Sequence, residues 1–167
     1  AARRLHAHPR HRAAASLART YPGGSAAFAA AVKKKILELG MHDTVIQEPT
    51  GLSPDNTSTA ADLVKMAVAA SRYPDIADIT TDRSDEIKIK GHNIQFRNTN
   101  RLVGKKDWNI LLSKTGFTNE AGNCLIMRVK LAGKNATLVL LTARAKSVRL
   151  LDALNIRRFL AAQTDAR

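Results

Sequence analysis

The residues of this chain that could do chemistry together are a lysine, a threonine and a glycine in succession. Lys114-Thr115-Gly116 stands at the end of a predicted strand, and Phe117 follows it. A lysine ammonium and a threonine hydroxyl suit the free carboxylate at the end of a peptide. A glycine leaves a strand edge bare, so a peptide backbone could lie against it as an added strand. The alternative is an ordinary exposed lysine before a glycine bend, and the tripeptide alone favours that alternative.

Strands must position this motif, and alternating apolar and polar residues predict them. Three strands are expected at Trp108–Thr115, Cys124–Leu131 and Thr137–Thr142. The segments between them, 118–122 and 132–135, have turn composition, which predicts an antiparallel meander. A hairpin is predicted before them, with strands Glu86–Lys90 and Ile94–Arg97 around Gly91-His92-Asn93.

Helices are predicted on both sides of the strands in the sequence. The first covers Ala13–Thr20, and the second runs from Ser25, as its N-cap, to Leu39, with a stripe of Phe28, Val32, Ile36 and Leu39. Thr59 and Asp62, spaced as a capping box, open a third helix to about Ser71 with a buried face of Leu63, Met66, Ala67 and Ala70. A last helix from about Ser147 is expected to bury Val148, Leu151, Leu154 and Phe159. The fold class is therefore α+β, an antiparallel sheet flanked by helices.

Composition and charge limit the possible functions. The 167 residues suit one domain with a net charge of +13, and residues 1–40 hold eight cations against Glu38 alone. Only 4% of the residues are aromatic, which argues against a nucleic-acid surface, although charge keeps that alternative open. Lys33–Lys35 could grip phosphates, but a solvated helix face is the favoured interpretation. No apolar run approaches the roughly 20 residues of a membrane span.

Metal and thiol chemistry have little support in the sequence. His6, His8 and His11 lie in the segment Ala1–His11, which is predicted to be disordered, and they have no carboxylate or thiol partners. Cys124 is the only cysteine, so an internal disulfide is impossible, and its apolar neighbours predict a small buried side chain.

Four segments resemble the low-molecular-mass penicillin-binding proteins of the D-alanyl-D-alanine endopeptidase and carboxypeptidase type. The four segments, one of which contains Lys114-Thr115-Gly116, occur in that family's order and at its spacings. The similarity runs from about Arg12 to Phe159. The segments are Arg12–Gly24, Glu48–Ser53, Phe96–Val103 and Trp108–Gly122. The chain is identified on these residues as a relative of the penicillin-recognising serine peptidases.

The resemblance implies a β-lactamase/transpeptidase-like fold and an acyl-enzyme mechanism on peptidoglycan D-alanyl peptides, without metal or organic cofactor. It implies that β-lactams bind the intact family member and that the location is the periplasm. Carried over residue by residue, Lys114 and Thr115 would bind the substrate carboxylate and Gly116 would give clearance. The backbone N–H of Phe117 would be one oxyanion donor.

The chain also departs from the family. None of its eight serines has a lysine three residues later, and none has an asparagine two residues later, so Ser-x-x-Lys and Ser-x-Asn are both missing. Residues 1–11 are unlike the family, and residues 12–162 resemble the C-terminal part of its domain. The expectations are therefore a truncated, weakly folded and catalytically inactive chain, without an export signal and with retention in the cytoplasm left open. The alternative is a non-catalytic binder of peptidoglycan peptides or of nucleic acid.

Overall fold

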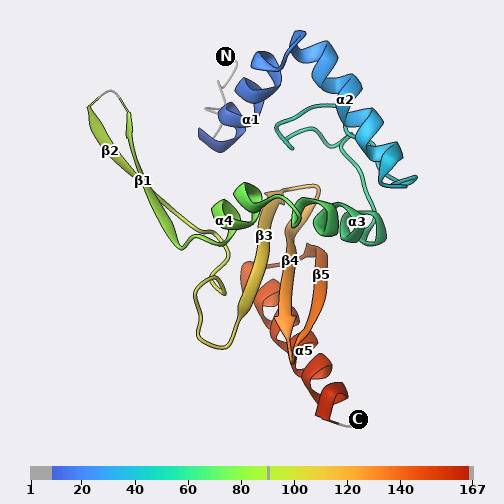
Figure 1. Cartoon of the computed structure of the whole chain (residues 1–167), viewed down its shortest axis with the longest axis vertical. Coiled ribbons are helices and arrows are strands. Elements are labelled where there is room, and N and C mark those ends of the chain that lie inside the picture. The colour runs from blue at the N-terminus through green and yellow to red at the C-terminus, as the bar shows by residue number, and fades with distance from the viewer. Residues whose placement is uncertain (1–8, 90, 166–167) are drawn as a thin grey trace. The chain divides into compact units, whose positions relative to one another are not determined.

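A computed structural model gives the structure of the protein and describes residues 9–89 and 91–165 (Figure 1). The chain divides into two compact units, residues 1–62 and 63–167. Residues 1–8, which include His6 and His8, lie outside the described residues. No helix in the described part of the chain is both long and apolar enough to cross a membrane.

The first unit opens with helix α1 (Pro9–Thr20). The predicted disorder of residues 9–11 is wrong, because the helix begins at Pro9 rather than Ala13. Proline is well suited to this place, since the N–H that it lacks has no intrahelical partner at a helix start. Ala18 is 3% exposed and is the buried residue among the side chains of α1 described from His11 onward.

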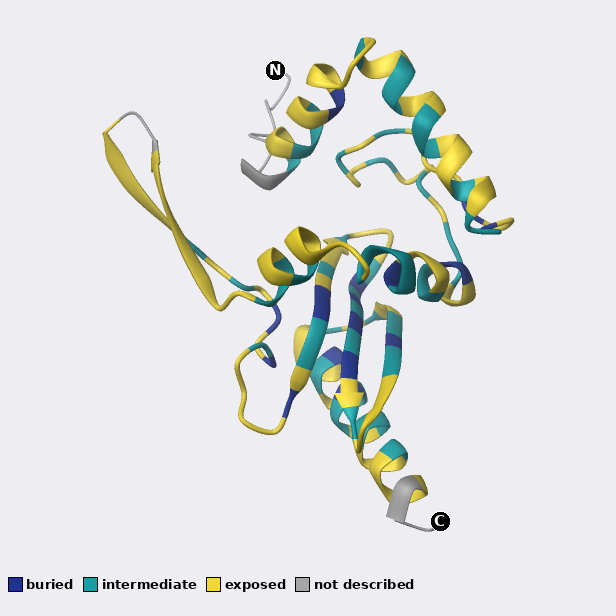
Figure 2. Cartoon of the chain, viewed as in Figure 1, coloured by how far each residue is buried: buried dark blue, intermediate teal, exposed yellow. Residues whose placement is uncertain are grey.

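Helix α2 (Gly24–Glu38) follows after a glycine turn, and the prediction that Ser25 caps it is wrong. The N-cap is Gly23 with φ 85°, and no side chain caps the helix. Gly24 has φ 76° and donates its N–H to the Tyr21 carbonyl at 2.7 Å, a left-handed turn that two glycines adopt easily. The predicted apolar stripe of α2 is only half-buried, and the helix has no fully buried residue (Figure 2).

The segment after α2 is a loop organised by two carboxylates. Glu48 accepts hydrogen bonds from the backbone N–H groups of Thr50, Leu52 and Ser53 at 2.7, 2.8 and 3.2 Å. Asp62, which is 2% exposed, accepts from the Asp43 N–H and the Thr44 hydroxyl, both at 2.9 Å. These bonds give the loop a fixed shape without regular secondary structure.

One hydrogen bond of the predicted capping box is present at the start of helix α3 (Ala60–Ala70). The Asp62 N–H donates to the Thr59 hydroxyl at 3.2 Å, and the Asp62 carboxylate also bonds Asp43 and Thr44. Ala67 is buried as predicted, whereas Met66 is 37% exposed.

Helix α4 (Pro74–Thr81) and a two-stranded hairpin come next. Helix α4 is not among the predicted helices, although Pro74 at its first turn and Asp75 beside it are helix-start signals. The predicted hairpin is confirmed as β1 (Ser84–Ile89) paired antiparallel with β2 (His92–Arg97). Nearly all of its described residues are exposed (Figure 2).

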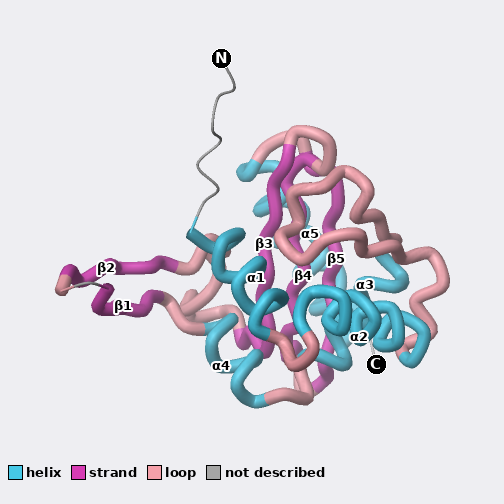
Figure 3. The backbone as a smooth tube through the Cα atoms, turned by 90° about the horizontal axis from the view of Figure 1, so that it is seen from above, coloured by secondary structure: helices cyan, strands magenta, loops and turns pink. Residues whose placement is uncertain are grey.

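A three-stranded antiparallel sheet in the order β3-β4-β5 confirms the predicted meander. The strands are β3 (Asn109–Thr118), β4 (Gly122–Leu131) and β5 (Lys134–Ala143), each longer than the prediction. Helix α5 (Lys146–Asp165) packs along one face of β4 and β5 (Figures 1 and 3). The α+β class is confirmed.

The core of the second unit lies between this sheet and α5. Buried residues alternate along β4, where Leu125, Met127 and Val129 are at most 2% exposed, and Ala153 of α5 packs on them. The predicted buried stripe of α5 is wrong in three of four positions, because Val148, Leu151 and Phe159 are 41%, 53% and 62% exposed. Leu154, the fourth predicted position, does pack against the core, together with Leu150, Ala153 and Ile156.

Candidate functional site

The Lys114–Phe117 stretch lies inside β3, which is an edge strand of its sheet. It pairs in regular register with β4 from Leu112 to Thr118, with Lys114 opposite Ile126 and Thr115 opposite Leu125. The sequence predicted this motif at the end of a strand, but the structure places it within β3. Gly116 is therefore not a bend. Strand β3 has no second strand partner along its other side in the described sheet.

Backbone groups of alternate residues face this free edge. The Ser113 N–H points away from β4, since it donates to the Thr80 hydroxyl of α4 at 3.4 Å. Successive residues in an antiparallel strand face opposite neighbours, so the N–H and C=O groups of Thr115 and Phe117 also face the free edge. Beyond the point that α4 covers, the edge thus presents the groups to which an extended peptide can pair.

The polar ends of Lys114 and Thr115 meet at the same edge. Their side chains leave opposite faces of the strand, but Lys114 curls so that its Nζ donates to the Thr115 carbonyl at 2.5 Å. The Thr115 hydroxyl lies 2.5 Å from the hydroxyl of Thr99. An ammonium and two hydroxyls at one edge can hold a carboxylate through charge-assisted hydrogen bonds.

Neither the backbone conformation nor the packing within the chain requires a glycine at position 116. Its φ is not in the left-handed region, and a Cβ built on it would come no closer than 3.9 Å to another heavy atom, the Cys124 Cβ. Gly122 differs, with φ 65° and a Cβ position 3.1 Å from the Thr142 backbone. Neither backbone conformation nor internal packing accounts for glycine at position 116, so the clearance it leaves is toward the outside of the molecule.

Asn98 and Asn100 position this edge, a role that the sequence did not reveal. The Asn98 side chain donates to the carbonyls of Thr80 and Asp82 at 3.1 and 2.9 Å. The Asn100 side chain donates to the Ser113 hydroxyl at 2.9 Å and accepts from the Leu102 N–H at 3.1 Å. Two asparagines at alternate positions thereby hold the segment containing Thr99 beside β3, and their spacing was the available sequence signal.

Residues 114–117 line neither the hollow of the first unit nor that of the second. The first, about 270 Å³, lies within the first unit and is lined by Ala18, Phe28, Val32 and neighbours. The second, about 320 Å³, lies in the second unit and is lined by Arg83, Arg97, Arg101, Lys105 and intervening residues. The candidate site consists of the free edge of β3 and the polar groups beside it.

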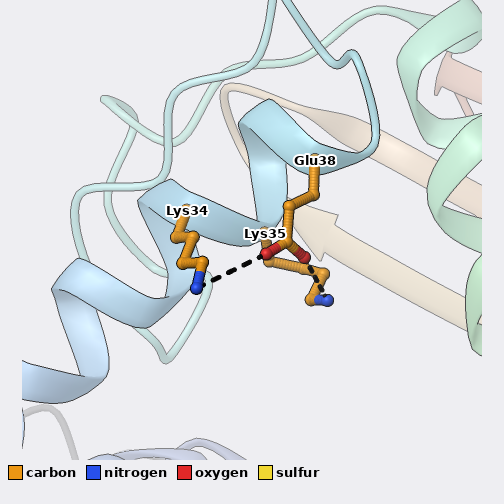
Figure 4. Close-up of polar contacts among 3 residues, drawn as sticks. All are labelled: Lys34, Lys35 and Glu38. Carbon is orange, nitrogen blue, oxygen red and sulfur yellow. Dashed lines mark hydrogen bonds and ion pairs between the residues drawn. The ribbon is translucent and has the colours of Figure 1, made fainter.

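The remaining candidate residues are in structural roles. Lys34 and Lys35 of the lysine run pair with Glu38 of the same helix at 3.9 and 2.5 Å (Figure 4), as expected for a solvated face. Cys124 is half-buried rather than buried, and its carbonyl accepts from the Arg149 guanidinium at 3.0 Å. His11 Nδ1 lies 2.8 Å from the Thr50 carbonyl, and no group of three metal-ligating side chains occurs among residues 9–89 and 91–165.

The sequence of this chain is similar to those of known D-alanyl-D-alanine peptidases. The family model described as D-alanyl-D-alanine carboxypeptidase matches residues 6–145, so the match begins six residues before Arg12. The Escherichia coli D-alanyl-D-alanine endopeptidase is 47% identical over 149 residues, covering 88% of this chain and 48% of that relative. The chain spans about half the length of the curated relatives that it matches.

Solved structures give the same result. A Streptomyces DD-transpeptidase matches with a TM-score of 0.80 and 25% identity, covering 88% of this chain and 61% of that chain. A cefotaxime-bound penicillin-binding protein from Listeria monocytogenes matches with a TM-score of 0.73 and 26% identity, covering 87% of this chain and 59% of that one. The chain belongs to the D-alanyl-D-alanine carboxypeptidase family, as a C-terminal portion of a low-molecular-mass penicillin-binding protein.

Proposed function

We propose that this chain forms the substrate-binding edge of a D-alanyl-D-alanine peptidase that acts on peptidoglycan stem peptides. The main support is the free edge of β3, where Gly116 leaves clearance that the chain itself does not use. An extended peptide ending in D-alanine would lie along this edge as an added strand. Carboxypeptidase and endopeptidase activity both require this placement.

Each residue of the stretch has a separate part in the proposal. Lys114 and Thr115 bind the terminal carboxylate of the peptide, and Thr99 positions the Thr115 hydroxyl through their 2.5 Å contact. The Phe117 N–H, which faces the free edge, donates to the oxyanion that develops when the D-alanyl carbonyl is attacked. A second donor and an attacking serine are needed to complete the reaction.

We propose that the 167 residues bind substrate without forming an acyl-enzyme. No serine in the printed sequence has the lysine three residues later that would take its proton in this family. An uncharged, unactivated serine hydroxyl is a weak nucleophile, and no other side chain at the β3 edge replaces it. Acyl transfer would require a Ser-x-x-Lys helix from outside these residues.

Two measurements on the purified chain test the proposal. A fluorescent penicillin should leave no covalent label on a denaturing gel, because labelling needs the nucleophile. A diacetyl-Lys-D-Ala-D-Ala peptide should bind reversibly and give NMR shifts at residues 113–117. The same peptide with a C-terminal amide should bind more weakly by about tenfold or more, since a charge-assisted hydrogen bond contributes roughly 1.5–3 kcal/mol.

Two variants separate binding from folding. Gly116→Ala should be as stable as the parent chain or slightly more so, because glycine within a strand is unfavourable by about 0.5–1 kcal/mol relative to alanine. It should nevertheless lose peptide binding, because its Cβ fills the clearance. Lys114→Ala should lower affinity for the free acid and leave that for the amide unchanged. Equal binding of free acid and amide, or covalent labelling, would contradict the proposal.

The proposed setting is the bacterial cell envelope, on the periplasmic side. Peptidoglycan is the family's substrate, and β-lactams are proposed ligands of the protein in its intact form. Nucleic-acid binding makes a different prediction, since affinity for DNA would fall steeply with salt and would not depend on Lys114 more than on other cations.

A further inference from the structure

The basic hollow of the second unit is the feature that this function leaves unused. It has a volume of about 320 Å³, and Arg83, Arg97, Arg101 and Lys105 are its charged lining residues. Asn98, Asn100, Val103 and Gly104 complete the lining, and none of the eight is acidic. Three guanidinium groups and one ammonium around a single hollow create a strongly positive local potential.

The backbone under these cations is held in place before any ligand arrives. Arg97 precedes Asn98, whose side chain bonds the carbonyls of Thr80 and Asp82. Arg101 follows Asn100, which is 4% exposed and bonded to Ser113. The Asn100 N–H also donates to the Asn98 Oδ1 at 3.0 Å, so the two anchors support each other. A preorganised backbone reduces the entropy lost when the two arginines bind an anion.

The third arginine is also constrained. The Arg83 Nη2 donates to the Gly104 carbonyl, and Gly104 has φ 74°. A Cβ at position 104 would lie too close to the Arg83 guanidinium, so any other residue there would require the Arg83 side chain to shift. The left-handed turn at Gly104 favours glycine, and its carbonyl holds the Arg83 guanidinium at the hollow.

The chain connects the lining of the hollow to the β3 edge through Thr99, which does not itself line the hollow. Arg97 and Arg101 are each two residues from Thr99, whose hydroxyl contacts that of Thr115. Two residues span at most about 7 Å of chain, so both arginine backbones lie close to the proposed carboxylate-binding groups. A peptide held at Lys114 and Thr115 would therefore bind within a few residues of chain of two of these arginines.

We propose that the hollow is a second carboxylate subsite, which binds an acidic group of the peptide other than its terminal carboxylate. This inference rests on the proposed function, because the peptide must first lie along β3. Guanidinium groups match a carboxylate in a planar, bidentate manner, which favours arginine over lysine at such a site. The subsite would select peptides with a free internal or branch carboxylate over neutral ones.

The test uses the full 167-residue chain and two peptides that end in D-Ala-D-Ala. One peptide has a free γ-D-Glu α-carboxylate, and its twin has that group as a carboxamide. Calorimetry should show that the acidic peptide binds about tenfold more tightly than the twin. The double variant Arg97→Gln/Arg101→Gln should reduce this preference to about twofold or less.

A matched control removes the same charge elsewhere. Lys134→Gln/Lys146→Gln takes two exposed cations from the second unit outside the hollow and should keep the full preference. Thermal melts of both double variants establish that they remain folded. Because Arg97 and Arg101 are exposed, their replacement should leave the melt unchanged.

The possible outcomes separate this inference from the proposed function. Binding that depends on the terminal carboxylate and Lys114, but not on the second carboxylate, would overturn the subsite alone. Absence of any peptide binding would overturn both proposals. An unchanged preference for the acidic peptide in Arg97→Gln/Arg101→Gln would likewise overturn the assignment of the second carboxylate to this hollow.

Discussion

The sheet region and the N-terminal helices bury their apolar residues to very different extents. Strands β3–β5 and helix α5 enclose a continuous core in which Met127, Val129 and Ala153 are fully buried. Helix α2 has no buried residue, and Leu17 and Leu37 of the first unit are about 70% exposed. The sheet region supplies its own packing partners within these residues, whereas the helices α1 and α2 do not.

This difference indicates where the folded chain should be weakest. Each large apolar side chain left exposed forgoes roughly 1.5–3 kcal/mol of burial, against a total stability of about 5–15 kcal/mol. We expect amide protons of β4 to exchange several orders of magnitude more slowly than those of α2, measured by hydrogen exchange. Equal protection of β4 and α2, or a single cooperative melt at high temperature, would remove the contrast.

Core truncation should give the largest single-residue effect. Met127→Ala is expected to destabilise the second unit by about 2–5 kcal/mol, because the residue is fully buried and leaves a cavity. Phe28→Ala in α2 should reduce the free energy of unfolding clearly less, since Phe28 is only half-buried. Urea denaturation followed by circular dichroism compares the two variants. A larger loss for Phe28→Ala would mean that the helices hold the more important core.

Removal of the buried Asp62 carboxylate should give the next largest loss of stability. Asp62→Ala removes the acceptor of the Asp43 N–H and of the Thr44 hydroxyl. Leaving a buried donor unsatisfied costs about 1–3 kcal/mol, so a loss in that range is expected. Asp62→Asn is the conservative comparison, since its amide oxygen can still accept. An unchanged denaturation midpoint for Asp62→Ala would show that the 43–62 loop is not tied to α3 in solution.

Acid should weaken the same loop through Glu48. Burial acts to raise the pKa of Glu48, but hydrogen bonds from the Thr50 hydroxyl and from the backbone of Thr50, Ser53 and Leu52 lower it to about 2. Because the folded pKa lies below the ordinary value, its stabilisation is complete above about pH 4.5 and is lost as pH falls toward 2. Glu48→Gln should flatten this part of the stability–pH curve, measured by denaturation at several pH values. A parallel acid loss in the variant would assign the effect to other groups.

The smallest effect is expected on the exposed face of α5. Leu151→Ser should change stability by no more than about 0.5 kcal/mol, because Leu151 is 53% exposed. The same exchange at Leu154, which packs against the core, should be clearly destabilising. Paired thermal melts distinguish the two faces of the helix. A large loss for Leu151→Ser would support the stripe that the sequence predicted.

The error on α5 has a physical cause. Helical periodicity identifies an apolar stripe but not which of two overlapping stripes meets the sheet, and Leu154 belongs to both. The structure selects the one that contains Ala153, whose small side chain permits close approach to β4. Arg149 and Arg157 flank this stripe, with Arg157 over the Trp108 ring at 5.4 Å.

The sequence by itself determined the order of the strands and of every helix except α4, the meander around Lys114-Thr115-Gly116, and the family. Alternation and turn composition are local properties, so they can be recognised without coordinates. Only the tertiary structure decided that Gly116 is free of internal constraint, that Thr99 meets Thr115, and that four cations share one hollow. Such relations join residues distant in the chain, and their geometry depends on side-chain packing that no local pattern encodes.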